Sequence, residues 1–171
     1  YLIRADRFAD AVPVLRESVK IYPQYDPAWI DLGIAFLRSG DEKEAEASLN
    51  EALRLRPGNA EAHLTLGMMY YGAGRLDEAR GHLERAVALA PGLAQAHFVL
   101  GTLHLKAAET RQAVEQFQAA LKQENTTLKS QIAKEFTDTL LKVARKPKEA
   151  TYLVIEEVAG ENWAQGEKFF G

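Results

Sequence analysis

The sequence predicts an all-α fold, a solenoid of stacked helical hairpins, and three observations carry this prediction. Proline recurs at Pro23, Pro57 and Pro91, a spacing of 34 residues. Around each proline the same residue types return in the same order, including small alanines and leucine–glycine pairs. A period of this length marks supersecondary units that bury their apolar faces only against their neighbours. Such a stack is typical of a recognition surface and rarely of a catalyst.

The first complete copy contains signals for two helices. Asp26 followed by proline is typical of a helix start, because aspartate can cap free amides and proline suits the first turn. Gly40 is expected to end this helix. Asp41, with Glu44 three residues later, has the spacing of a capping box for the second helix. Pro57 and the following glycine then stop that helix.

The period divides the chain into a repeat array and a different C-terminal part. We expect a partial copy and three complete copies, at residues 1–25, 26–59, 60–93 and 94–127. Because Tyr1 would lie late in the first helix of the partial copy, we expect the chain to belong to something longer. Asn125 stands where the next proline is due. We therefore expect a degenerate helical hairpin at 128–159 that caps the stack, and a tail at 160–171.

The repeated residues resemble the tetratricopeptide repeat, whose signature is W-x2-L-G-x2-Y, then A-x3-F, then P. The matching residues are Trp29, Leu32-Gly33, Phe36, Ala45, Leu49 and Pro57; His63, Leu66-Gly67, Tyr70, Ala79, Leu83 and Pro91; and His97, Leu100-Gly101, His104, Ala113 and Phe117. The resemblance covers residues 1–127 and implies a right-handed α-solenoid with protein partners. The glycines of the leucine–glycine pairs are expected where two helices approach closely.

The resemblance also implies that the first helix of each hairpin lines a concave, ligand-binding groove. The groove residues carried over are Ile30, Ile34, Leu37, Arg38, Leu64, Met68, Tyr71, Phe98, Thr102, Leu105 and Lys106. They predict an apolar groove with basic residues at its edge, suited to a partner helix or peptide. One subgroup of the family binds acidic C-terminal tails, but Ile30, Ile34 and Leu64 stand at such positions and cannot hold a carboxylate. An alternative is that the 160–171 tail fills the groove.

The histidines are interpreted as packing residues. His63 and His97 hold the position of Trp29, and His104 holds that of the repeat tyrosine. Their ring tips can reach polar partners, so we expect structural roles and no metal site. His82 lies on a second helix and is expected to be exposed.

Composition and motifs narrow the function classes. A net charge of -3 argues against nucleic-acid binding, and no apolar run is long enough to span a bilayer, although association with a membrane complex stays open. The chain has no cysteine, phosphate loop or H-E-x-x-H motif, so no enzyme activity and no cofactor are expected. We expect a non-catalytic scaffold or adaptor, a subunit of a larger complex. The alternative is a substrate-recruiting or regulatory domain of a larger enzyme whose catalytic part is absent from this chain. The compartment stays undetermined.

Overall fold

The computed structural model describes residues 8–122, and they form seven α-helices. The helices are α1 (Phe8–Ile21), α2 (Asp26–Ser39), α3 (Glu42–Leu55), α4 (Ala60–Gly72), α5 (Leu76–Leu89), α6 (Ala94–Lys106) and α7 (Thr110–Leu121). The expected all-α fold is confirmed over this range. The capping hairpin and tail expected after residue 127 lie outside the described residues.

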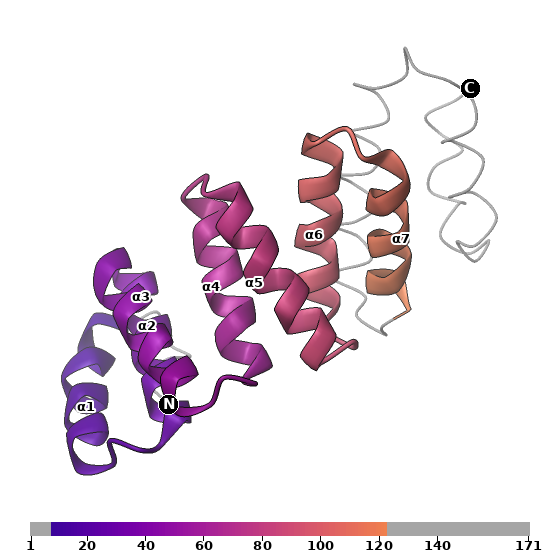
Figure 1. The fold of residues 1–171 in the computed structure, drawn as a ribbon. Helices are drawn as coiled ribbons and strands as arrows, with labels where there is room; N and C mark the ends of the chain where they lie inside the picture. Colours follow the sequence, from indigo (N-terminus) through magenta and orange to yellow (C-terminus); the bar gives the residue numbers. More distant parts are fainter. Residues whose placement is uncertain (1–7, 123–171) are drawn as a thin grey trace, which may run out of the picture.

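The helices pack as successive hairpins, and the hairpins follow one another along an elongated array (Figure 1). The pairs α2–α3, α4–α5 and α6–α7 are the hairpins, and α1 packs against α2. Between hairpins, α3 contacts α4 and α5 contacts α6. Consecutive first helices also contact each other, α2 with α4 and α4 with α6. In the described range, no two second helices contact each other as extensively as these first helices do. The first helices therefore lie on the side where the array is tighter.

Glycines at the leucine–glycine pairs set the distance between the two helices of each hairpin. A Cβ atom added at Gly33 would lie 2.7 Å from Leu49 Cγ, and one at Gly67 would lie 2.6 Å from Leu83 Cγ. At Gly101 the nearest atom would be Phe117 Cε1, at 2.7 Å. The predicted close approach is confirmed. The close packing must stabilise the fold by more than the roughly 1 kcal/mol that a glycine inside a helix costs relative to alanine.

The first helices end in left-handed residues at one repeat position. Gly40 ends α2 with φ of 87°, as expected from the sequence, and Gly74 follows α4 with φ of 76°. In the third hairpin Ala108 takes the same position with φ of 60°. Because a Cβ atom makes this conformation unfavourable, Ala108 is a strained residue in the α6–α7 turn.

Two of the expected helix caps are wrong. The side chain of Asp41 forms no capping hydrogen bond at the start of α3, so the capping box with Glu44 is absent. Asp26 is already the first residue of α2, and its buried carboxylate serves another contact. Arg56 Nη2 donates to Asp26 Oδ1 at 2.6 Å, and Asn59 Nδ2 donates to Asp26 Oδ2 at 2.7 Å. Arg56 follows α3 and Asn59 is the N-cap of α4, so this carboxylate ties α2 to the start of the second hairpin through Asn59.

Candidate protein-binding face

The predicted groove residues lie on the three first helices, which contact one another in sequence. Ile30 is 3% exposed and belongs to the core, so it offers no surface to a partner. The remaining predicted residues are half-buried or exposed, and we call them the inner face. They are Ile34, Leu37, Arg38, Leu64, Met68, Tyr71, Phe98, Thr102, Leu105 and Lys106. The inner face is therefore mostly apolar and aromatic.

Aromatic rings organise part of the inner face. The Phe98 ring packs at 5.9 Å from the Phe117 ring, measured between centroids, which ties α6 to α7. Lys106 Nζ lies 4.6 Å from the centroid of Tyr71, a cation–π contact between α6 and α4. The Arg38 guanidinium carbon lies 5.7 Å from the centroid of Phe8. These contacts restrain the two basic side chains while leaving their heads at the surface.

Asp31 is a residue that the sequence reasoning missed on this side of α2. Its side chain is exposed and makes no hydrogen bond or ion pair within the described range, yet partial burial raises its carboxyl pKa above the ordinary 3.8. An unpaired, partly desolvated carboxylate favours a cationic neighbour. The repeat register could have identified it, because Asp31 lies one period before Thr65 and therefore at the equivalent position of the preceding first helix.

We call the contact between a second helix and the hairpin that follows it a junction, so that α1 forms the first, α3 the second and α5 the third. Polar contacts across the second junction join α3 to the hairpin α4–α5. The Tyr70 hydroxyl donates to Glu46 Oε1 at 2.7 Å, and Arg75 Nη1 donates to Glu46 Oε2 at 3.3 Å. The Arg75 guanidinium also lies 4.3 Å from the Tyr70 ring centroid. Burial and the Glu46 hydrogen bond raise the pKa of Tyr70 to about 12. The phenol is therefore held protonated as a donor.

The third junction uses the same positions with the charges reversed. Arg80 Nη1 donates to Glu109 Oε2 at 3.1 Å, and His104 Nδ1 donates to the same oxygen at 2.6 Å. These hydrogen bonds, that of His104 first, lower the pKa of Glu109 below its ordinary 4.5. His104 is thus a buried polar bridge at the position of the repeat tyrosine, as the packing interpretation expected.

A ring N–H at one repeat position binds the proline that closes the preceding copy. Trp29 Nε1 donates to the Pro23 carbonyl at 3.0 Å. His63 Nε2 donates to the Pro57 carbonyl at 3.2 Å, and His97 Nε2 donates to the Pro91 carbonyl at 3.0 Å. Histidine can replace tryptophan here because both rings present an N–H to the same carbonyl.

The expectation that His82 is exposed is wrong. His82 is half-buried, and its Nδ1 lies 3.1 Å from Nδ1 of His63. Because His63 Nε2 donates to a carbonyl, the neutral His63 ring accepts through Nδ1 and His82 donates. Burial lowers the pKa of both histidines below 6.5, and the charge of His63 lowers that of His82 further. The folded structure therefore favours the neutral form of both histidine rings.

Comparison with known families covers the array described above. The family model described as tetratricopeptide repeat matches residues 1–60 and 30–94, and a second model with the same description matches residues 70–132. The chain belongs to the tetratricopeptide-repeat family. Its described residues thus form a repeat domain of the protein-interaction type. None of the helices in this range is long and apolar enough to cross a membrane.

Solved structures with similar folds include three tetratricopeptide-like chains. The APC/C hetero-tetramer Cut9-Hcn1 gives a TM-score of 0.74 at 24% identity, over 84% of this chain and 28% of that one. The pilF protein of Pseudomonas aeruginosa gives 0.72 at 25% identity, over 84% and 65%. A thermophilic TPR protein of Thermus thermophilus gives 0.69 at 24% identity, over 82% and 76%. The chain thus spans less than two thirds of the length of the first two.

A different family model matches the C-terminal part of the chain. The model described as tautomerase enzyme matches residues 123–171, which lie outside the described residues and form a minority of the chain. No curated protein sequence matches the chain.

Proposed function

We propose that the repeat array is a non-catalytic scaffold or adaptor that binds a helix or peptide of a protein partner on its inner face. The observation that carries the proposal is the recurrence of half-buried apolar side chains on three neighbouring helices. Leu64, Met68 and Phe98 illustrate it, with Ile34 and Leu105 at the two ends. A partner helix with an apolar stripe would cover these side chains.

The test removes the apolar character of this surface without removing the core. Leu64 and Phe98 pack against the core, so replacing them by polar residues will also cost stability. Met68→Glu is the sharper variant, because Met68 is half-buried and is not part of the packed cluster. Leu76→Glu is the matched control, since Leu76 is 36% exposed at the start of α5.

The measurement is recovery of partners by affinity purification from native lysate, together with helicity by circular dichroism. We expect Met68→Glu to abolish recovery of the specific partner while helicity stays unchanged. Leu76→Glu should recover the partner as the parent protein does. Undiminished recovery by Met68→Glu would remove the inner face as the binding site. Loss of recovery by both variants would point to a general effect of the added charge.

A second candidate occupant of the inner face is the segment 160–171 of the same chain, which lies outside the described residues. Deleting it distinguishes the two occupants. If the segment covers the inner face, its deletion should increase the binding of a dye specific for exposed apolar surface. Unchanged dye binding would leave the external partner as the occupant.

A second candidate function is favoured by the tautomerase match over residues 123–171. In this case the repeat array would recruit or position partners for an enzyme of which this segment is a part. The test is keto–enol conversion of an α-keto acid, phenylpyruvate, followed by ultraviolet absorbance. Activity that disappears on removal of residues 123–171 would support the enzyme-linked function. Absence of activity in the intact chain would leave the scaffold function.

A further inference from the structure

Two histidines of the central hairpin bring their ring nitrogens together. His63 lies on α4 and His82 on α5, and their Nδ1 atoms are 3.1 Å apart. The ring centroids are 5.2 Å apart and the ring planes are tilted by 44°, so the rings meet through their nitrogen edges and are not stacked. We call these two residues the histidine pair. Neither residue belongs to the inner face, so the proposed function leaves the pair unused.

The distance between the two nitrogens fits a shared metal ion. Zinc binds histidine nitrogen at about 2.0–2.1 Å. Two nitrogens 3.1 Å apart, each at that distance from one ion, would subtend an angle of about 100° at the ion. This angle lies between the square-planar geometry of copper or nickel sites and the tetrahedral geometry of zinc sites. The hydrogen bond therefore holds the two nitrogens at a spacing that a bound ion could use.

Contacts behind each ring fix its orientation. His63 Nε2 donates to the Pro57 carbonyl at 3.2 Å, which leaves Nδ1 of the neutral ring with its lone pair toward His82. A histidine that binds a metal commonly donates its other N–H to a carbonyl or carboxylate in this way. The His82 ring centroid lies 5.4 Å from that of Tyr70, whose hydroxyl is held by Glu46. Both rings are therefore oriented in the absence of an ion.

The histidine pair is neutral and partly open to solvent, as a ligand of a transition metal has to be. Burial lowers the pKa of both rings, so at neutral pH both are in the uncharged form that binds metal. The charge of Arg85 disfavours a cation at His63, whereas the carboxylate of Glu46 favours one at His82. Both histidines are only half-buried, so an ion and its water ligands can reach them.

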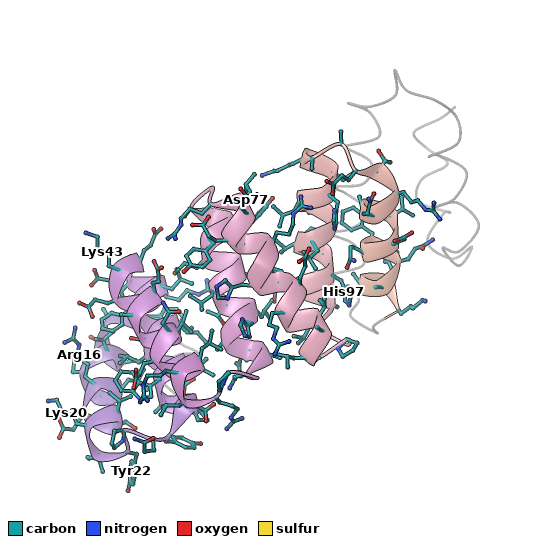
Figure 2. The ribbon with its side chains drawn as sticks, viewed as in Figure 1. Arg16, Lys20, Tyr22, Lys43, Asp77 and His97 are labelled. Atoms are coloured by element: carbon teal, nitrogen blue, oxygen red, sulfur yellow. The ribbon has the colours of Figure 1, made fainter. Side chains whose placement is uncertain are left out.

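The other two histidines of the chain have different partners. His97 lies on α6, in the next hairpin along the array (Figure 2), and its Nδ1 lies 2.7 Å from the amide oxygen of Gln116. His104 Nδ1 donates to Glu109. The chain has four histidines in all and no cysteine. Among the residues that the structure describes, no group of three or more histidine, aspartate or glutamate side chains is placed to hold an ion. A bound ion would therefore have two protein ligands, with water supplying the rest.

We propose that the histidine pair is a binding site for a divalent transition-metal ion such as Zn²⁺, held by Nδ1 of His63 and Nδ1 of His82 and completed by water. The sequence-based expectation of histidines without metal treated His82 as exposed, and its pairing with His63 removes that premise. When the ion binds, the hydrogen on Nδ1 of His82 moves to Nε2 of the same ring, so the neutral pair loses no proton overall. Structural zinc sites are closed by four protein ligands, so an ion with two exchanges readily.

The histidine pair also has a purely structural explanation, which the test has to separate. In the third hairpin, His97 and Gln116 make the corresponding contact between the two helices without two imidazoles. The hydrogen bond can therefore join the helices of a hairpin in the absence of any ion. That explanation predicts that the protein and its His82→Gln variant have the same affinity for zinc.

The experiment titrates Zn²⁺ into the intact, metal-free chain, produced without a histidine tag. Isothermal titration calorimetry gives the affinity and the stoichiometry, and circular dichroism checks the helicity of each variant. We expect one ion per chain. His82→Gln should weaken binding at least about 10-fold while helicity stays unchanged. His97→Gln is the matched control, because His97 holds the repeat position of His63 in the next hairpin, and it should bind zinc as the parent protein does.

Two further measurements test the geometry of the site. Gln116→His places a second histidine beside His97 and should raise the stoichiometry from one ion to two. An ion that binds only the folded chain raises the melting temperature, so Zn²⁺ should raise it in the parent protein and less in His82→Gln. The absorption of Co²⁺ in the visible range, present in the parent and lost in His82→Gln, would show nitrogen ligation at the pair directly.

The outcomes of these measurements are independent of the inner face. Absence of zinc binding by the parent protein at millimolar Zn²⁺ would overturn the metal site. Equal affinities of the parent protein and His82→Gln, or an effect of His97→Gln as large as that of His82→Gln, would also overturn it. Met68→Glu leaves both histidines in place, so recovery of the protein partner and zinc binding can each fail without the other.

Discussion

Glu46 and Arg80 occupy the same position of successive second helices and carry opposite charges, and each pairs with a residue of the following hairpin. Glu46 accepts from Tyr70 and Arg75, whereas Arg80 and His104 donate to Glu109. At the corresponding position of the first junction stands Val12, with Phe36 in place of the tyrosine. The same repeat positions thus carry different chemistry at the three junctions.

Reversing one member of the third junction should destabilise the array. Arg80→Glu alone makes two carboxylates face each other, so we expect a lower urea midpoint at neutral pH. The double variant Arg80→Glu, Glu109→Arg reproduces the polarity of the second junction and should recover most of the loss. Because the pKa of Glu109 is lowered in the fold, its contribution is present above pH 4.5 and is lost as the pH falls through the lowered pKa. Failure of the double variant to recover stability would argue against pairing at this junction.

Two glycines of α4 should respond in opposite directions to alanine. The methyl group of Gly67→Ala would collide with Leu83 and meet the Ala79 carbonyl oxygen at 3.3 Å, so we expect a loss of about 1–3 kcal/mol. Gly72→Ala adds a methyl group in open space and should gain up to about 1 kcal/mol from helix propensity. Urea denaturation of both variants measures the difference. Similar losses at the two sites would refute the close-approach account.

Relief of the strained turn before α7 should stabilise the protein. Ala108 has φ of 60° where the two preceding hairpins use Gly40 and Gly74. Ala108→Gly removes the Cβ conflict and, after the greater freedom of glycine in the unfolded chain, should gain up to about 1 kcal/mol. The reciprocal variant Gly74→Ala should lose about as much. Thermal unfolding of the pair tests this, and a destabilising Ala108→Gly would contradict it.

The histidine pair should make the central hairpin sensitive to acid. The pKa values of His63 and His82 are lowered in the fold, so the unfolded chain binds more protons once the pH falls below 6.5. The contribution of this pair to the free energy of unfolding is therefore largest above pH 6.5. It declines as the pH falls below 6.5 and becomes constant below the lowered pKa values. His82→Gln copies the third hairpin, where Gln116 Oε1 lies 2.7 Å from His97 Nδ1, and should flatten this decline.

The reciprocal variant gives the control for the histidine pair. Gln116→His would create a second histidine pair and should steepen the decline. Urea midpoints measured at about pH 7.5 and about pH 5.5 provide the comparison. A pH dependence that neither variant changes would exclude the pair as its source.

Sequence reasoning predicts the features that recur in every copy. Gly33, Gly67 and Gly101, with their leucine or phenylalanine partners, define the hairpin contact, and they follow from the period alone. The residues that it places wrongly depend on contacts between copies. The carboxylate of Asp26 does not cap its helix because Arg56 and Asn59 bind it, and these contacts span about one full period. Ile30 is likewise wrongly placed, since it lies in the core cluster and not at the surface.

Because the second and third junctions have opposite charge polarity, each hairpin fits only at its own place in the array. In a solenoid with uniform junctions, removing one whole repeat would be the mildest deletion available, because the neighbours on either side would meet in an equivalent way. Removal of residues 60–93 from this chain would instead bring Glu46 of α3 against Glu109 beside α7, with both of their cationic partners, Arg75 and Arg80, gone. The hairpins therefore cannot be exchanged for one another, because the charged pairs at the junctions fix the order of the hairpins along the array.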